Sequence, residues 1–360
     1  MTQVGLVTIT PPTLRPNLLS SDAAGRMAPR FALLQTAVVL FAVAQSGCSK
    51  LILTKAADGL SSGTGGAFAR DDDPEFVRDA IPFALKTMES LADQLPDHAP
   101  LRVSLASGFT SYSYAFIQAD ADELDSTNAK KAAELRHRAK RMYVRARDYG
   151  LQGLQISRGI TLEDLRKGDD ARGAALAKAT KDDVPLLYWT LVPWAAAIAA
   201  EKRDLALVGD LPIIAAILDR AIALDPDWQE GSLDEFSLAF DGVRSGGVKP
   251  EQTKAHYDRA LQFSHGARVS VQVSWAENVL VAKQDKTAFE KQLNEVLAFD
   301  TDNPQWRDLR LANLIAQRRA RYLLTHEEDL IAGRITPQDS LASGSHELSI
   351  RSSLVMQLQQ

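Results

Sequence analysis

"RAIALDPDWQEG" occupies residues 220–231, where an apolar run ends at an aspartate and a proline-bearing turn follows. "EVLAFDTDNPQW" at 295–306 has the same order of features, and "LADQLPDHAPLR" at 91–102 contains a similar turn. Proline disrupts a helix interior but is accepted in the first helical turn. Each segment therefore predicts the end of one helix and the start of the next.

A second pattern recurs within the helices that these turns delimit. A small or apolar residue is followed four positions later by an aromatic or apolar residue, and three positions after that by another small or apolar residue. Such spacing lets a neighbouring helix approach while the central side chain fills the groove. The residues are Ala139, Tyr143, Ala146; Ile214, Leu218, Ala221; Thr253, Tyr257, Ala260; and Phe289, Leu293, Val296.

This pattern resembles the second half of a tetratricopeptide repeat, a helix-turn-helix unit whose stacking buries a continuous core. The spacing between the matches is irregular. We therefore predict an all-α fold of tetratricopeptide-like helix-turn-helix repeats forming an irregular solenoid. The alternative is a non-repetitive helical domain that matches the pattern by chance.

Helix starts are also visible in the sequence. Asp73 is followed at once by proline, and Asp183 is followed by proline after one residue, which predicts two helix N-termini. Pro82 and Pro193 lie eight residues beyond these prolines and predict kinks. "VSVQVSW" at 269–275 alternates as a strand does, but it lacks a partner strand in the sequence and is predicted to be helical.

The single cysteine, Cys48, follows a basic lead at 27–30, an apolar run at 31–44 and a pair of small residues. This is the layout of a bacterial secretory signal, and the run is too short to span a bilayer. It resembles a lipoprotein signal in which Cys48 becomes the lipid-modified first residue, although Gln45 stands where an aliphatic residue is usual. The alternative is a buried free cysteine in a helix.

The predicted signal peptide determines how the segments on either side of it are interpreted. We expect translation to begin at Met27, which would make the residues before it a wrongly assigned leader. The segment after Cys48 ends in a Gly/Ser/Thr-rich stretch, typical of a flexible tether. The predicted organisation is leader 1–26, signal peptide 27–47, tether 48–70, helical domain 71–333 and loose tail 334–360.

Composition excludes several classes of function. The formal net charge is −5 and no basic face dominates, so nucleic acid is not an expected partner. The six histidines are scattered, and "HEED" at 326–329 lacks the second histidine of a zinc-protease motif. We predict no catalytic residues, no metal site and no cofactor, and hence a protein that is not an enzyme. The basic stretch 134–150 is expected to be a solvated helix face, with a docking patch as the alternative.

Two aromatic-rich segments are candidates for a ligand or interface site. Tyr112 and Phe116 are four residues apart and share a helix face, while Tyr188, Trp189 and Trp194 lie beside small residues. The two tryptophans are about 140° apart around an ideal helix, so one is expected to face a cavity or a subunit contact. Core packing is the alternative for each aromatic residue.

A cluster of arginines near the last predicted helix is the other candidate. Arg318, Arg319 and Arg321 could neutralise an acidic group of a ligand or partner. The alternative is a solvated helix face.

Several segments together resemble one family. They are "DDPEFVRDAIPFALKTMESLADQLPD" at 72–97, "LASGFTSYSYAFIQADADELD" at 105–125, "RARDYGLQGL" at 145–154, "DVPLLYWTLVPWAAAIAAEKRD" at 183–204, "ALDPDWQEGSLDEF" at 223–236 and "NLIAQRRARYLL" at 313–324. They look like the T component of tetratricopeptide-associated TRAP transporters, which are periplasmic lipoproteins.

The resemblance implies a non-enzymatic role in solute uptake. The partner would be a periplasmic solute-binding protein that feeds an ion-driven permease, and the protein would assemble as a homotrimer. A hydrophobic or organic-acid ligand would be conducted or held. The chain would be anchored to the membrane by lipid at Cys48, and Ser49 in the next position favours the outer membrane. A scaffold for assembling envelope complexes is the alternative function.

Overall fold

The structure is a computed structural model that describes residues 66–244 and 247–331. All of them belong to one unit of the chain. Their regular elements are helical, and these two ranges contain no strand, so the all-α prediction is confirmed.

The elements of the first half are α2 (Gly66–Ala69), α3 (Pro74–Gln94), α4 (Ala99–Tyr112), the π-helical η1 (Ser113–Gln118), α5 (Ala119–Glu123), α6 (Ala129–Arg158), α7 (Leu162–Arg166), α8 (Asp169–Leu176), the 3-10 turn η2 (Lys181–Asp183) and α9 (Val184–Ala200). The second half contains α10 (Leu205–Val208), α11 (Leu211–Leu224), α12 (Trp228–Phe240), α13 (Pro250–Phe263), α14 (Ser270–Trp275), the π-helical η3 (Ala276–Leu280), α15 (Val281–Lys283), α16 (Lys286–Leu297), the 3-10 segment η4 (Pro304–Leu309), α17 (Arg310–Thr325) and α18 (Glu327–Leu330).

The predicted proline-bearing turns lie between helices. One connects α3 to α4, one connects α11 to α12, and one connects α16 to η4 and α17. In the α11–α12 turn, Gln229, Glu230 and Gly231 have positive φ angles of 44°, 54° and 88°, so regular helix begins only after Gly231. The helix pairs predicted from these segments are therefore present.

The residues of the recurrent spacing lie in the core. All of them are buried except Thr253, which is half-buried. The Thr253 hydroxyl donates to Asp241 Oδ2 at 2.8 Å, so it has a polar partner in place of apolar packing. The spacing thus identified core positions in four helices.

The helix starts follow the sequence prediction in part. Asp73 caps α3, because its carboxylate accepts from the backbone N–H groups of Glu75 and Phe76 at 3.0 Å each. Asp183 precedes α9 as predicted, but its carboxylate accepts instead from the Thr180 N–H at 2.8 Å and from Arg158 Nε at 2.6 Å.

The other helix predictions have mixed outcomes. The segment 269–275 is helical as predicted, since α14 covers most of it. Pro82 and Pro193 lie inside α3 and α9, which continue past them. The kinks stay predictions.

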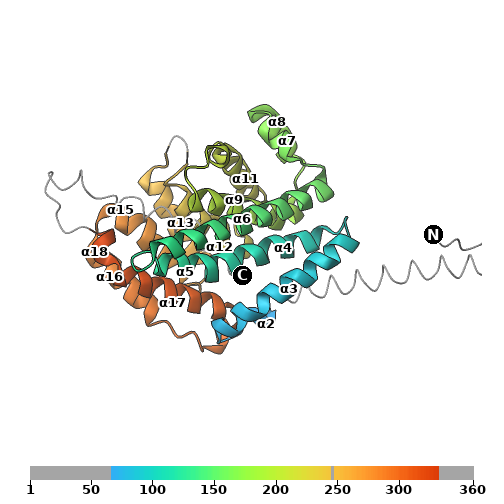
Figure 1. Ribbon diagram of the computed structural model, residues 1–360. Helices are drawn as coiled ribbons and strands as arrows, with labels where there is room; N and C mark the ends of the chain where they lie inside the picture. Colours follow the sequence, from blue (N-terminus) through green and yellow to red (C-terminus); the bar gives the residue numbers. More distant parts are fainter. Residues whose placement is uncertain (1–65, 245–246, 332–360) are drawn as a thin grey trace, which may run out of the picture. The chain divides into compact units, whose positions relative to one another are not determined.

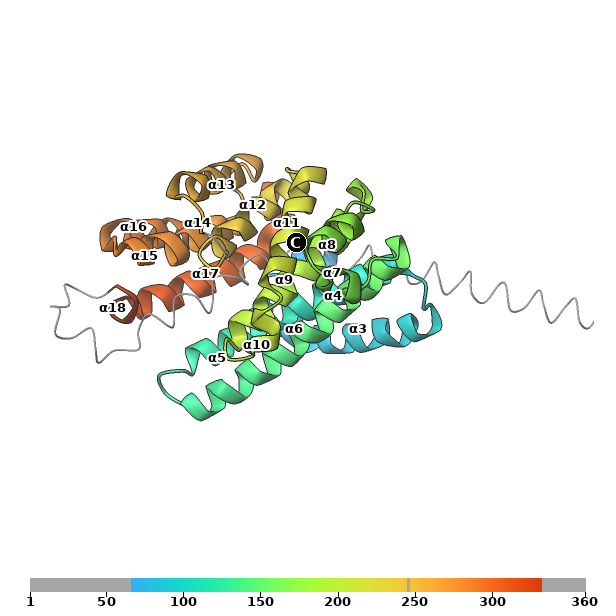
Figure 2. The same cartoon turned by 90° about the horizontal axis from the view of Figure 1, so that it is seen from above.

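The longest helix, α6, packs against both α4 and α9 (Figures 1 and 2). Glycine permits the approach to α9: a Cβ atom at Gly150 would lie 2.9 Å from the Thr190 Cα atom. Gly153 faces Leu186 one turn further along. The backbone at Thr190 cannot shift without moving α9. A side chain at Gly150 would therefore force α6 and α9 apart.

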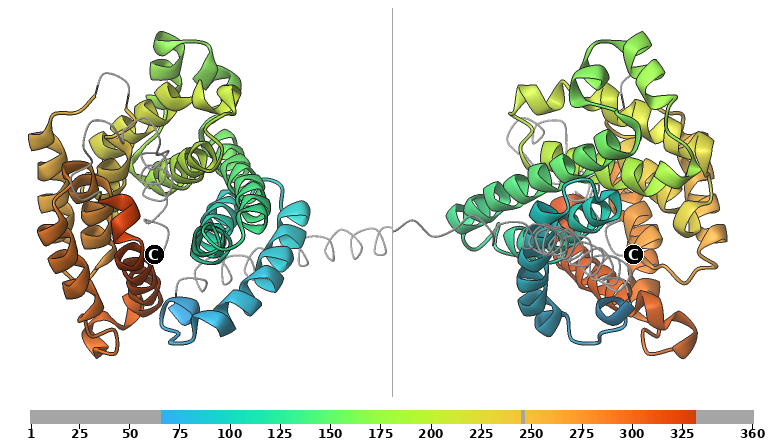
Figure 3. Two further views of the ribbon diagram at one scale, coloured as in Figure 1. Left: turned by 60° about the vertical axis from the view of Figure 1, so that its left-hand side comes forward. Right: turned by 90° about the vertical axis from the view of Figure 1, so that its right-hand side faces the viewer.

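The last long helix returns to the start of the described chain. Helix α17 packs against α14 and α16, and it also contacts α2 and α3 (Figure 3). Arg310 of α17 pairs with Asp72 at 3.1 Å, and Arg70 pairs with Asp308 at 2.5 Å. The two ends of the described chain are therefore held together by ion pairs.

Within the described residues, the segment Lys181–Ala200 is long and apolar enough to cross a membrane, but 89% of its most apolar stretch is buried inside the fold. A helix in the core of a domain has the same property. The predicted leader, signal peptide, Cys48 and tail lie outside the described residues, as does nearly all of the tether.

Candidate functional site

Two π-helical segments interrupt the α-helices. Segment η1 carries α4 into α5 without a break, and η3 joins α14 to α15. A π-helix accommodates extra residues in a turn and is frequent at functional sites. Neither segment could be predicted from the sequence, because neither contains a glycine or proline that would mark an irregularity.

Arg319 of α17 connects these two regions. Its side chain is buried, Nη1 donates to Asp122 Oδ2 at 3.0 Å, and Nη2 donates to Glu277 Oε1 at 2.5 Å. Nε donates to the other Glu277 oxygen at 3.3 Å, so Arg319 binds both oxygens of this carboxylate in a bidentate manner. Asp122 lies just after η1 and Glu277 lies within η3. We call Arg319, Asp122 and Glu277 the internal ionic cluster.

Burial sets the electrostatics of this cluster. It raises the pKa of the Glu277 carboxyl above its usual range, although the positive charge of Arg319 opposes the shift. Burial lowers the pKa of Arg319, but Glu277 and Asp122 more than compensate and leave it above the ordinary value. Tyr114 lies beside the cluster, and burial raises the pKa of its hydroxyl. That hydroxyl has no hydrogen-bond partner among the described residues.

Arg318 makes a second set of contacts with the same segment. It donates to Glu123 Oε1 at 2.7 Å, to Asp120 Oδ1 at 2.9 Å and to the Ala115 carbonyl at 3.2 Å. A solvated role is therefore wrong for Arg319 and incomplete for Arg318, because both guanidinium groups already bind carboxylates. Arg321 is exposed.

The aromatic candidates separate into different surroundings. Tyr112 and Phe116 pack against each other with ring centroids 5.7 Å apart. Tyr188 and Trp189 meet edge to face with centroids 5.0 Å apart. The structure does not bring these two pairs together with Trp194, whose ring lies under the Arg147 guanidinium at 5.2 Å.

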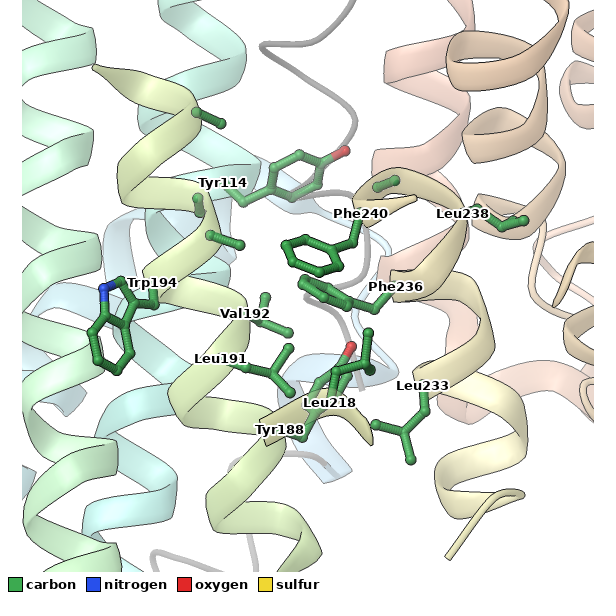
Figure 4. Packing of buried hydrophobic residues seen from close by; sticks show 14 of the residues in the cluster. Tyr114, Tyr188, Leu191, Val192, Trp194, Leu218, Leu233, Phe236, Leu238 and Phe240 are labelled. Carbon is green, nitrogen blue, oxygen red and sulfur yellow. The ribbon is translucent and has the colours of Figure 1, made fainter. Parts of the chain in front are cut away.

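Figure 4 shows that side chains of α9 point to opposite sides of the helix. Tyr188, Leu191 and Val192 point toward Phe236 of α12, whereas Trp194 points to the other side of the helix. That side faces α6, which carries Arg147. The two tryptophans are only 3% and 0% exposed. Trp194 thus faces a second part of the protein interior, and Trp189 is buried as well.

An apolar cleft lies between α3, α4, α17 and α2. It has a volume of about 120 Å³ and opens to solvent, and its walls include Ile81, Leu85 and Met88 of α3 and Leu311 of α17. Phe116 also lines it, so one predicted site residue belongs to this cleft. The other predicted site residues do not line it.

This cleft was not predicted from the sequence. Helix α4 contributes a row of small residues to the cleft, Ser104, Ser107, Gly108 and Ser111. Their spacing is helical and could have indicated a small-residue face, but a small-residue face is more often a helix contact. Gly108 serves such a contact in addition, because a Cβ there would lie 2.7 Å from Leu85 Cδ2.

The basic stretch 134–150 is partly solvated, since Arg138 and Arg141 are exposed, but two of its cations are paired within the fold. Arg136 pairs with Asp125 at 2.8 Å, and Lys140 pairs with Asp204 at 2.8 Å. Their side chains are only 15% and 19% exposed. The predicted solvated face is therefore wrong at these two positions, since acidic side chains of α5–α6 and α9–α10 connections cover them.

In the part of the chain that the structure describes, no three His, Cys, Asp or Glu side chains are grouped as metal ligands. The fold and the site define a class of protein: an all-helical protein with an internal ionic cluster and an apolar cleft open to solvent.

Comparison with known families identifies the group within that class. The family described as TRAP transporter T-component matches residues 70–331, so the chain belongs to this family. It is also similar to an uncharacterized protein of Treponema pallidum (strain Nichols), with 26% identity over 267 residues that cover 73% of this chain and 81% of the relative. Membership associates the chain with TRAP transport in the cell envelope, and the family is not a known enzyme family.

Proposed function

We propose that this chain is a non-enzymatic periplasmic lipoprotein that serves a TRAP-type uptake system by binding its solute-binding protein. The observation that carries the proposal is the family match over residues 70–331, which spans nearly all of the described fold. Within the described fold, Arg136 and Lys140 of α6 and Arg319 of α17 form internal ion pairs. This arrangement suits a rigid binding body.

The proposal includes a lipid anchor at Cys48 after a signal peptide at 27–47, with the outer membrane favoured. The sequence pattern around Cys48 supports it. The proposal also includes tetratricopeptide-like stacking and assembly as a homotrimer. The buried small and apolar positions in α6, α11, α13 and α16 support the stacking.

We further propose that the protein conducts or holds a hydrophobic or organic-acid ligand. Phe116 supports this part, because its ring lines the apolar cleft and packs on Tyr112. Tyr188, Trp189 and Trp194 of α9 are proposed as further ligand or interface residues. Of the three arginines, Arg318 and Arg321 are proposed as an interface, in which Arg321 supplies the exposed charge. Arg319 is buried and binds Asp122 and Glu277 instead.

The tryptophan assignment is tested with Trp189→Ala and Trp194→Ala, each assayed separately for folding and for uptake. Because Trp194 is completely buried, its truncation is expected to cost about 3–5 kcal/mol of stability. A folded variant that has lost uptake supports a role in the ligand path. Variants that unfold, or that fold and transport normally, contradict it.

The main test is capture of the full-length protein from envelope membranes after cross-linking, followed by mass spectrometry. We expect recovery of a TRAP solute-binding protein. An unrelated lipoprotein of the same envelope, captured in parallel, is the control. Recovery of outer-membrane or pilus assembly proteins without a solute-binding protein would favour the scaffold function instead.

A further inference from the structure

The apolar cleft between α3, α4, α17 and α2 has a defined capacity. Its volume is about 120 Å³. An engineered apolar cavity of about 150 Å³ binds benzene, which has six carbons, so a volume of this size holds roughly five carbons. The cleft therefore matches an aliphatic chain of about five carbons.

The chemistry of the walls is apolar on most sides. Ile81, Leu85 and Met88 form the α3 wall, Leu311 lies on α17, and the Phe116 ring lies at η1. Flexible unbranched and branched aliphatic side chains accommodate a linear hydrocarbon better than they accommodate a rigid polar solute. The walls thus favour the hydrophobic ligand class.

The polar groups of the cleft accept hydrogen bonds. Ser107 donates its hydroxyl proton to the Ser104 carbonyl at 3.1 Å, and Ser104 donates its own to the Pro100 carbonyl at 3.2 Å. Each hydroxyl oxygen then has lone pairs left to accept a proton. Asp308 is the charged residue that lines the cleft, and it adds carboxylate oxygens near the Arg70 guanidinium. A ligand head that donates a hydrogen bond fits these groups, whereas a carboxylate does not.

We propose that this cleft binds a linear aliphatic chain of about five carbons with an uncharged, hydrogen-bond-donating head such as a hydroxyl group. The inference rests on the proposed role in holding a ligand, and it selects the hydrophobic ligand over the organic acid. It is tested on the purified full chain alone. Its failure is therefore distinguishable from a failure to capture the solute-binding protein.

The first experiment measures the affinity of the wild-type protein for a series of straight-chain alcohols by equilibrium dialysis. Each added methylene is expected to tighten binding about fourfold until the cleft is full. Affinity should then level off at about five to six carbons. An affinity that keeps rising with length, or pentanoate that binds more tightly than pentan-1-ol, would overturn the proposal.

The second experiment fills the cleft from opposite walls. Ala84→Leu on α3 and Ala312→Leu on α17 each add side-chain carbons to a lining position. Each is expected to weaken pentan-1-ol binding at least tenfold. Ala223→Leu is the matched control, because Ala223 is exposed on α11 and does not line the cleft.

Circular dichroism identifies any variant that does not fold. If one filling variant does not fold, the other variant and the alcohol series test the proposal. Unchanged affinity in a folded filling variant, or an equal loss in the control, would contradict the proposed site.

Discussion

Arg319→Met is expected to destabilise the protein strongly. It removes the guanidinium group whose Nη2 and Nε donate to the two Glu277 oxygens at 2.5 and 3.3 Å. Removing one partner of a buried ion pair costs about 3–5 kcal/mol, because the charge of the other partner stays buried away from water. Asp122 is less affected, because Arg136 lies 3.8 Å from its carboxylate. Glu277 should therefore account for most of the cost.

The dependence on pH gives a sharper test of this reasoning. Burial raises the pKa of Glu277, and losing Arg319 removes the positive charge that opposes this shift. The native state of the variant then binds its proton more tightly than the unfolded state does. Stability consequently falls as pH rises above the unfolded-state pKa. We expect a smaller deficit at pH 5 than at pH 8.

Urea denaturation at both pH values measures the free energy of unfolding. Adding Glu277→Gln to Arg319→Met should recover about 1–3 kcal/mol and flatten the pH dependence. Arg321→Met is the control: this residue is exposed on the same helix, so its change should stay within about 0.5 kcal/mol. A deficit below about 1 kcal/mol for Arg319→Met, or one equal at both pH values, would refute the reasoning.

Three further outcomes are expected. Cys48→Ser should leave the helical content unchanged and release the protein from membranes, since acyl chains bind by about 0.8 kcal/mol per methylene; palmitate labelling that persists in the variant would exclude the anchor. Gly150→Ala should destabilise by about 1–3 kcal/mol in thermal denaturation, because the new Cβ would lie 2.9 Å from the Thr190 Cα atom; an unchanged melting temperature would mean that the helices separate freely. Asp73→Ala should cost about 1 kcal/mol through loss of the α3 cap, with Asp73→Asn retaining most of the stability, and equal losses in both variants would argue against capping.

The sequence predicted those features that depend on local chemistry. Asp73 as a cap and the helix ends at the proline-bearing turns follow from the residues themselves, as do the core positions in four helices. Residues such as Tyr143 could be assigned to the core because their neighbours one turn away are small.

The features that the sequence did not predict depend on distant partners. From the sequence alone, Arg319 resembles a surface residue, because other arginines lie beside it. In the structure it binds Asp122 and Glu277, which lie 197 and 42 residues away in the sequence. The cleft is likewise formed by four elements and has no motif of its own. The helical angle between Trp189 and Trp194 predicted only that one of them faces a second environment, and packing decides that Trp194 faces α6.

The return of α17 to the beginning of the described chain has a consequence for folding. Arg318 meets Glu123 across 195 residues, and Arg70 meets Asp308 across 238 residues. Contacts this far apart in sequence form slowly, because a long loop must close before they contribute. The η4 and α17 residues of these pairs leave the ribosome long after their partners. Until then Glu123 lacks Arg318, and Asp122 has Arg136 but not Arg319, so the native state should form only after synthesis of α17 is complete.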